Sequence, residues 1–575
     1  MKKLSKFLKP FALMTAFVLV LVFLQSLSEL YLPTLMADIV DKGVMNGDSA
    51  YVWKIGGYML LVAAGGMACS IAASYYSAKV ASGFGKNLRS KVFSHVSGFS
   101  LHEFDQIGTS SLITRTTNDI TQVQQVLVMM LRMMVMAPLM CIGGIIMAVS
   151  KDAKLTLVLA VSLPVLILVI VILAKKGLPL FKSMQKKLDG LNRVLRENLT
   201  GIRVVRAFNR IEHEKKRFDV ANLDLTETAI RVNKLMATLM PIMMIFLNLT
   251  TVAIIWFGGI RIDHGHMQVG DLMAFIQYAM QIMFSLVMVS MMFVMIPRAA
   301  VSAGRITEVL ELTADISDPL APKQPEAGRG VVEIQDVTFR YPGAELPALS
   351  SISFAMKPGE TTAIIGGTGS GKSTLVNLLP RFYDIESGRI LIDGVDIREM
   401  TQDDIRSRIG FVPQQAVLFS GTIAENIRFG KEDATDEEIR HAAKIAQAED
   451  FIEAMPDGYD SIIFQGGSNV SGGQKQRLSI ARALVRKPEI YVFDDSFSAL
   501  DFKTDAKLRA ALKAETGDSS VLIVAQRVST IMDADQIIVL DEGKIAGIGK
   551  HRELLETNKV YREIVMSQLS EEEIV

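Results

Sequence analysis

A glycine-rich segment that follows a short apolar run is the clearest chemical motif of this sequence. It reads Gly-Gly-Thr-Gly-Ser-Gly-Lys-Ser over residues 366–373, after a predicted strand at Thr361–Ile365 and before a predicted helix at Ser373–Leu379. Glycines let backbone N–H groups curl around the phosphates of a nucleotide, and Lys372 places a cation beside them. The hydroxyl of Ser373 suits Mg²⁺. The segment therefore predicts a phosphate-binding P-loop.

Two later segments carry chemistry that complements this loop. Ile490–Phe493 is a buried strand by its composition and ends at Asp494, a carboxylate able to complete a Mg²⁺ site. Ser471–Gln474 is a Ser-Gly-Gly-Gln turn that opens a helix expected to run to about Val485. A helix N-terminus binds anions through its free N–H groups, so this turn is a second candidate phosphate site. Taken alone, an ordinary capped helix explains it equally well.

Long apolar stretches precede these motifs and indicate a membrane domain. A membrane-spanning helix needs about 20 mostly apolar residues. Six windows meet this requirement: Phe11–Met36, Ile55–Ala78, Val126–Val149, Leu155–Ala174, Met236–Ile260 and Leu272–Ile296. Only two of them contain a charge, Glu29 in the first and Arg132 in the third. We therefore expect six spans.

The charge distribution orients these spans and limits the partners. Residues 1–310 carry 32 basic and 18 acidic side chains, whereas 311–575 carry 29 and 43. The basic excess lies in two long connections, 79–125 and 175–235, which places them and both termini in the cytoplasm. The acidic C-terminal half excludes nucleic acid as a main partner, because phosphate neutralisation needs Lys and Arg. The chain is expected in the cell membrane.

A proline-rich stretch separates the membrane part from a second domain. Beyond it, short apolar runs alternate with helical patterns, as in α/β domains. The runs are Val331–Phe339, Thr361–Ile365, Ile490–Phe493, Val521–Val524 and Ile537–Leu540. We expect an all-α six-helix transmembrane domain over 1–312, a linker over 313–330 and an α/β P-loop nucleotide-binding domain over 331–575.

Together these motifs resemble those of ATP-binding cassette (ABC) exporters of the half-transporter type, and the resemblance covers essentially the whole chain. It implies ATP and Mg²⁺ as cofactors, with Ser471–Gln474 as the signature and Ser498–Asp501 as the D-loop. The implied ATP contacts are Tyr341, Gly366, Gly367, Thr368, Gly369, Ser370, Gly371, Lys372, Ser373, Thr374, Ser471, Gly472, Gly473, Gln474 and Asp501. The implied Mg²⁺ ligands are Ser373, Gln414 and Asp494.

The resemblance also implies a dimer, because each ATP lies between one P-loop and the signature of the opposite subunit. Two bends in the long cytoplasmic connections, near Leu101–Gly108 and Asn209–Arg217, look like the coupling helices that transmit motion to the spans. Gln414 matches the glutamine that senses Mg²⁺ and the membrane domain. With Asp495 and Gln526, it forms the implied catalytic set.

Two residues of that set depart from the family pattern. Asp495 stands where the general base is usually Glu, and Gln526 stands where a histidine is usual. The carboxylate is thereby retracted by about 1.5 Å, and an amide can neither titrate nor carry positive charge. The segment Phe464–Gly467 also lacks the charged residues common in exporters. Because the signature is intact, we expect a heterodimer in which a partner half-transporter supplies an intact Glu and His.

Substrate and direction stay open at this stage. Methionines cluster in the spans, for example Met129, Met130, Met133 and Met134. Flexible thioethers suit a path for varied amphipathic molecules, although helix packing explains them equally well. Multidrug-type or lipid export through the membrane is the favoured function. The alternatives are a homodimeric lipid or peptide exporter, an exporter-fold importer, and a nucleotide-sensing regulatory or channel subunit.

Overall fold

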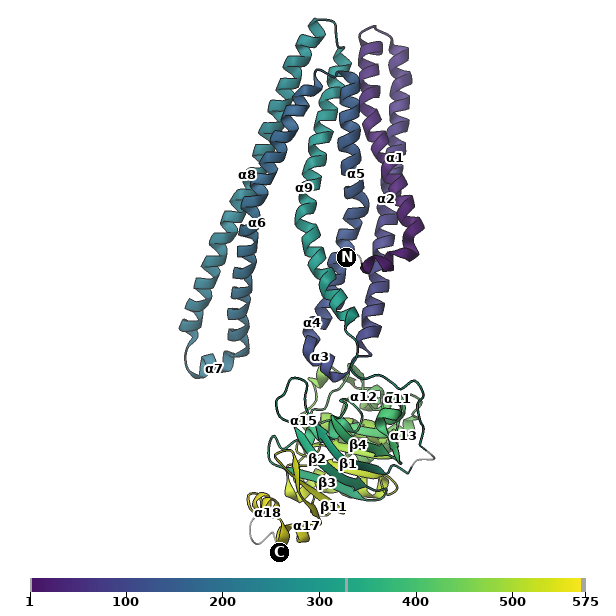
Figure 1. Ribbon diagram of the computed structural model, residues 1–575, viewed down its shortest axis with the longest axis vertical. Helices are drawn as coiled ribbons and strands as arrows, with labels where there is room; N and C mark the ends of the chain where they lie inside the picture. The colour runs from purple at the N-terminus through teal and green to yellow at the C-terminus, as the bar shows by residue number, and fades with distance from the viewer. Residues whose placement is uncertain (1–2, 326–328, 570–575) are drawn as a thin grey trace. The chain divides into compact units, whose positions relative to one another are not determined.

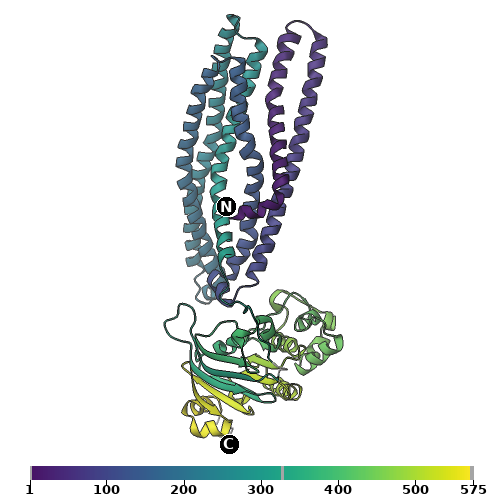
Figure 2. The same cartoon turned by 45° about the vertical axis from the view of Figure 1, so that its right-hand side comes forward.

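The computed structural model of the chain describes residues 3–325 and 329–569 and divides into two compact units (Figures 1 and 2). The first unit contains the chain up to residue 97 together with 109–312. The second contains 98–108 together with the chain from 313 onward. Segment 98–108 therefore packs with the C-terminal domain, although both of its neighbours in sequence belong to the first unit.

All regular elements among the described residues of the first unit are helices. Its elements are η1 (Leu4–Phe11), α1 (Ala12–Asp38), η2 (Ile39–Val44), α2 (Ser49–Val96), α4 (Thr109–Thr114), η3 (Arg115–Asp119), α5 (Ile120–Lys151), α6 (Thr156–Thr200), α7 (Ile202–Ala207), α8 (Ile211–Asp263) and α9 (Val269–Glu311). Six of its helical stretches are long and apolar enough to span a membrane, which confirms the six predicted spans. Helix α1 packs along α2, α5 along α9, and α6 along α8 (Figure 1).

The second cytoplasmic bend lies upstream of its predicted position. Helix α6 ends before Gly201, α7 covers Ile202–Ala207, and α8 already begins at Ile211. The predicted segment 209–217 therefore includes the end of the bend at Asn209 and Arg210, whereas the rest of it is the first part of α8. The bend closes at Asn209, whose φ of 51° suits asparagine better than most residues. The apolar periodicity runs across Gly201 and so conceals the break.

The second unit is an α/β domain built on two main sheets. Its strands are β1 (Val332–Phe339), β2 (Leu349–Met356), β3 (Thr361–Gly366), β4 (Ser387–Ile392), β5 (Val395–Asp396), β6 (Ile409–Val412), β7 (Gly421–Thr422), β8 (Ile462–Ile463), β9 (Ile490–Asp494), β10 (Ser520–Val524), β11 (Gln536–Asp541) and β12 (Lys544–Gly549). The larger sheet has the order β12-β11-β3-β10-β9-β6, with only β12 antiparallel. The smaller sheet is antiparallel, in the order β2-β1-β4-β5. All five named strand predictions are confirmed.

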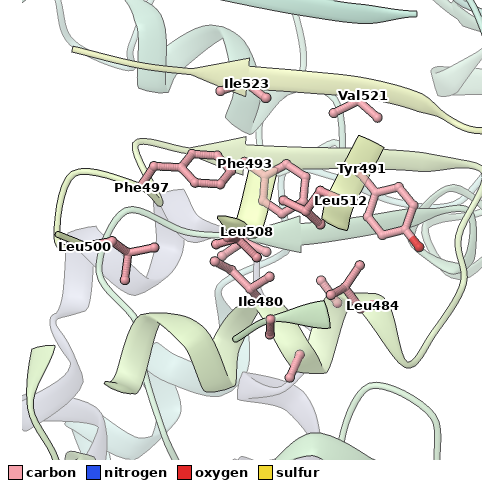
Figure 3. Packing of buried hydrophobic residues seen from close by; sticks show 14 of the residues in the cluster. Ile480, Leu484, Tyr491, Phe493, Phe497, Leu500, Leu508, Leu512, Val521 and Ile523 are labelled. Carbon is pink, nitrogen blue, oxygen red and sulfur yellow. The ribbon is translucent and has the colours of Figure 1, made fainter. Parts of the chain in front are cut away.

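Helices make up the rest of the regular structure of this unit, and several of them pack against the parallel sheet. They include α3 (Leu101–Ile107), α10 (Lys372–Leu378), α11 (Gln402–Ser407), α12 (Ile423–Arg428), α13 (Asp436–Ile445), α14 (Glu449–Glu453), α15 (Gly472–Leu484), α16 (Phe502–Glu515), α17 (His551–Thr557) and α18 (Lys559–Met566). Figure 3 shows Tyr491 and Phe493 of β9 facing Ile480 and Leu484 of α15. This packing fixes α15 against β9, the strand that ends at Asp494. Because parallel strands place their carboxyl ends at one edge of a sheet, Asp494 lies at the same edge as the end of β3.

Candidate functional site

The P-loop connects the end of β3 to the start of α10. Gly369 and Gly371 adopt φ values of 82° and 97°, which glycine reaches without steric cost. A Cβ on Gly366 would collide with the carbonyl oxygen of Leu540 and lie 2.6 Å from the hydroxyl of Ser370. A Cβ on Gly369 would meet no described atom within 4 Å, so the loop's outer side is open. This backbone can approach a phosphate group closely.

Lys372 lies across the beginning of the loop. Its Nζ donates hydrogen bonds to the carbonyl oxygens of Gly366 and Gly367, at 2.9 and 2.7 Å. Burial lowers the pKa of Lys372, while the nearby carboxylates of Asp495 and Asp494 act in the opposite direction. A phosphate placed here would meet a partly desolvated cation.

Ser373 and Asp494 form an oxygen pair that fits Mg²⁺. Ser373 Oγ donates to Asp494 Oδ1 at 3.3 Å. Burial raises the pKa of Asp494, and the charge of Asp495 adds to this, while Ser373 and Lys372 oppose it. A divalent cation would stabilise a carboxylate whose charge is disfavoured in this way. Mg²⁺ takes few protein ligands when phosphates supply the rest, so this donor set fits it.

A cavity of about 490 Å³ opens beside this pair. It is lined by Ser373, Asn377, Phe411, Pro413, Gln414, Gln415 and Asp494. The hydroxyl of Ser370 is also buried and has no hydrogen-bond partner among the described residues. A buried donor without a partner is costly unless a ligand satisfies it. Together the cavity, the open loop and this hydroxyl fit a bound nucleotide with its metal ion.

The three predicted catalytic side chains meet at one carboxylate oxygen. Gln526 Nε2 donates to Asp495 Oδ2 at 2.8 Å, and Gln414 Nε2 donates to the same atom at 3.3 Å. Asp495 adopts φ of 47°, and its N–H donates to the carbonyl of Val524 at 3.0 Å. Burial raises the pKa of Asp495, while the hydrogen bond from Gln414 lowers it. Both of these donors are neutral amides.

Tyr341, one of the predicted ATP contacts, contacts the first turn of α10. Its hydroxyl lies 3.0 Å from Thr374 Oγ1. Its ring meets Phe339 and Tyr383 edge to face, with centroids 4.9 and 5.4 Å apart. The structure thus brings Tyr341 and Thr374 together within the P-loop region.

The sequence did not identify Tyr383 as part of this region. Burial, together with the nearby charge of Asp105 in α3, raises the pKa of Tyr383 to about 12. Tyr383 therefore lies between the segment 98–108 and Tyr341. The sequence does show the aromatic pair Phe382-Tyr383 soon after α10. No local pattern, however, predicts that Tyr383 lies near Asp105.

Glu103 fixes the same segment to the start of the linker. Its carboxylate accepts hydrogen bonds from Ser100 N–H at 2.6 Å, Ser100 Oγ at 2.7 Å and Asp315 N–H at 3.0 Å. The side chain is 1% exposed. Burial alone raises the pKa of Glu103, but these hydrogen bonds outweigh it and lower the pKa. The segment 98–108 is therefore held by a fully paired carboxylate.

The signature residues form a capped helix N-terminus away from the cavity lining. Gln474 N–H donates to Ser471 Oγ at 3.3 Å, and Ser471 N–H donates to Gln474 Oε1 at 2.8 Å. Gly472 and Gly473 begin α15. Asp501 caps α16 through the Thr504 N–H at 3.0 Å, and this bond lowers its pKa. Of these predicted ATP contacts, none belongs to the described residues that line the cavity.

Comparisons with known proteins agree on the family across the chain. The family model described as ABC transporter transmembrane region matches residues 15–310, and the model described as ABC transporter matches residues 349–498. An uncharacterised ABC transporter ATP-binding protein of Mycobacterium tuberculosis is 45% identical over 569 residues, which are 98% of this chain and 97% of that protein.

Two further similarities cover most of the chain. A protein of the same species, named fatty acid ABC transporter ATP-binding/permease protein, is 36% identical over 475 residues, 82% of this chain and 75% of its own length. The solved structure of a bacterial Atm1-family ABC exporter with ATP bound has a TM-score of 0.81 and 27% identity. The alignment covers 97% of this chain and 98% of that one.

Proposed function

The chain belongs to the ABC transporter family as an exporter-type half-transporter, and from this premise we propose that it works as one half of a heterodimer. The family makes it a multi-pass cell-membrane protein with a cytoplasmic ATP-binding domain that couples ATP hydrolysis to transport. We propose that ATP drives the export of amphipathic small molecules, of multidrug type, or of lipids. The fatty acid transporter named above supports an amphipathic cargo.

The proposal divides the chain by role. The cargo path lies in the transmembrane domain over 1–312, the linker covers 313–330, and the cassette over 331–575 binds ATP. Residues 326–328 of that linker lie outside the described residues. On the cassette, the P-loop from Gly366 to Thr374 and Tyr341 hold ATP, and Ser373, Gln414 and Asp494 hold Mg²⁺. Mg²⁺ supplies charge neutralisation at the phosphates when it is bound.

One observation supports the heterodimer proposal most directly. Two neutral amides, Gln526 and Gln414, donate hydrogen bonds to the same oxygen of Asp495. An oxygen that already accepts two hydrogen bonds has little remaining capacity for the proton of an attacking water. Neither amide can become a cation, as a histidine can. A misplacement of about 1 Å can cost roughly 10²-fold in rate. We therefore infer that this chain's own P-loop side holds ATP but turns it over slowly.

The intact signature complements this weak side. Ser471 and Gln474 form a reciprocal cap that holds the N-terminus of α15 in shape for an anion. We propose that this N-terminus, with Asp501, completes a competent site on a partner half-transporter. That partner carries the general-base Glu and the His that are replaced here by Asp495 and Gln526.

A matched pair of variants within this chain tests the proposal. ATPase activity is measured in membranes that contain the chain alone and in membranes that contain it with its partner. We expect slow turnover alone and fast turnover together. In the pair, Ser471→Ala should reduce turnover about tenfold or more, because it removes a hydroxyl from the competent site, whereas Asp495→Asn should have little effect.

The contrary results are equally distinct. Robust turnover of the chain alone that Asp495→Asn abolishes would support the homodimer and overturn the heterodimer. Accumulation of an amphipathic dye in inside-out vesicles tests direction, because an importer would deplete the dye from them. ATP hydrolysis without any flux would favour a regulatory or channel subunit.

A further inference from the structure

Glu29 is the one acidic residue within the predicted apolar spans, and it is half-buried on α1. The large exposed side chains of this helix include Val20, Leu24, Leu27 and Tyr31, which recur at helical spacing on one face. At 100° per residue, Glu29 lies opposite that face, in line with the buried residues Val22 and Gln25. The carboxylate therefore points toward neighbouring helices, and in a membrane such an acid marks a functional site.

Two amide side chains join Glu29 at the contact between α1 and α9. Gln25 Nε2 donates to Glu29 Oε1 at 2.9 Å, and Gln281 Nε2 of α9 donates to the backbone oxygen of Glu29 at 3.2 Å. The same two helices are joined by Tyr278, whose hydroxyl donates to the carbonyl of Leu30 and lies 2.7 Å from Thr34 Oγ1. The cluster is thus placed by a fixed helix pair.

The cluster has more hydrogen-bond acceptors than donors. Gln281 Oε1 is buried and has no partner among the described residues. Within the described part of the chain, Gln25 is the side-chain donor to Glu29, and no Lys, Arg or His forms an ion pair with it. A carboxylate and a free amide oxygen in an apolar span are costly unless a cationic donor satisfies them. A positively charged N–H group would satisfy both of them.

The cluster lies deep within the spans, where an unpaired charge is most costly. Glu29 lies nine residues before the outer end of α1, and Gln281 lies 12 residues after the outer start of α9. At 1.5 Å per residue, both are about 14–18 Å below the outer helix ends. Met140 and Met283 are buried in the apolar core that includes Leu30. A carboxylate and two amides next to this apolar core match a molecule with one charged end and an apolar body.

We propose that Glu29, Gln25 and Gln281 form a binding site for the protonated amine headgroup of an amphipathic substrate. This inference rests on the proposed export function and specifies its substrate class. A fatty acid carries a carboxylate, which Glu29 would repel, so the cargo preference differs from that named for the fatty acid transporter. An ammonium with N–H donors should also bind better than a quaternary ammonium, because only the former can donate to Gln281 Oε1.

The test uses the full-length chain in lipid nanodiscs, with empty nanodiscs to correct for partition into lipid. Dodecylamine, dodecyltrimethylammonium and dodecanoate share one chain length and differ in headgroup. We expect saturable binding in that order of affinity. Glu29→Gln should weaken dodecylamine about 10- to 100-fold, as for the loss of a charge-assisted hydrogen bond. Gln281→Met should reduce the preference for dodecylamine over the quaternary compound.

Leu27→Gln is the matched control, because it adds an amide at similar depth on the exposed face and should leave all three affinities unchanged. Unchanged dodecylamine binding in Glu29→Gln, or equal binding of dodecanoate, overturns the inference. So does a Glu29→Gln variant that unfolds at lower temperature but keeps its headgroup preference, since that marks a structural role. If only the headgroup site is wrong, ATP-driven export of other amphiphiles is still observed. If the proposed export function is wrong, no ATP-driven flux is observed for any amphiphile.

Discussion

Gln526 donates a hydrogen bond to Asp495, so we expect the effects of the two departures from the family pattern to be coupled. Glutamate at position 495 extends the carboxylate by about 1.5 Å, and histidine at 526 supplies a group that can carry charge. We expect Asp495→Glu with Gln526→His to raise ATPase activity of this chain by about 10²-fold, and each single change to raise it less. Steady-state ATPase in membranes with and without the partner measures this.

Asp495→Asn in the same background is the control for that experiment, because it keeps the side-chain length and removes the base. An inactive double variant that still binds ATP would show that other residues limit turnover. An equal gain from Asp495→Glu alone would show that Gln526 does not limit turnover.

Local sequence was sufficient for the parts of the site that one segment builds. The P-loop glycines, Lys372 and Asp494 belong to patterns in which spacing and the flanking strand determine the geometry, and the structure has both elements. Gln414, Asp495 and Gln526 come from separate strand ends, so their shared hydrogen bonds depend on the sheet order. Tyr383 and Asp105 are distant in sequence, and only folding brings them together.

At the scale of elements, α3 is the point where a cytoplasmic connection of the membrane domain joins the cassette. In the native protein the Glu103 carboxylate accepts hydrogen bonds from Ser100 and Asp315. Glu103→Gln replaces one carboxylate oxygen with an NH₂ group, which cannot accept from these donors, so at least one hydrogen bond is lost. We expect a cost of about 1–3 kcal/mol in local stability. Hydrogen exchange of 98–108 should accelerate, and substrate-stimulated ATPase should fall while ATP binding persists.

The pH dependence of this element has a defined sign. Folding lowers the pKa of Glu103 below its ordinary value of 4.5, so its contribution is present at neutral pH and lost as the pH falls through the folded pKa. Glu103→Gln should remove that acid sensitivity of 98–108. Glu432→Gln, at an exposed position, is the control for charge loss and should preserve it. A Glu103→Gln variant with unchanged hydrogen exchange of 98–108 and unchanged substrate-stimulated ATPase would contradict this role of Glu103.

Long apolar periodicity made the spans predictable, and the same regularity concealed the second bend. Six windows of about 20 apolar residues leave little choice in a bilayer, which requires every backbone group to be paired. The break at Gly201 costs few apolar contacts and therefore leaves no mark in the hydrophobic pattern. The packing of 98–108 with the cassette was likewise unpredictable from local composition, because Glu103 depends on a backbone N–H at residue 315.

At the scale of the whole molecule, the proposed function places the signature of one subunit over the P-loop of another. The signature residues are absent from the described lining of the P-loop cavity, although both belong to one cassette. A homodimer and a heterodimer can both bring the signature of this chain to a P-loop on another subunit. They differ in whether that P-loop belongs to a second copy of this chain or to a different half-transporter. Cysteine cross-linking distinguishes the two arrangements. The native cysteines, Cys69 and Cys141, are replaced beforehand.

In that cysteine-free background, Thr368→Cys and Ser471→Cys are combined in this chain alone and exposed to a mild oxidant with Mg²⁺ and ATP. A homodimer would bring each Thr368 position close to the opposite Ser471 position and give a covalent dimer. We expect no such dimer. With the partner present, Ser471→Cys alone should cross-link to a cysteine in the partner's P-loop, and only when nucleotide is bound. An efficient ATP-dependent dimer of this chain alone would refute the heterodimer, even if transport itself were confirmed.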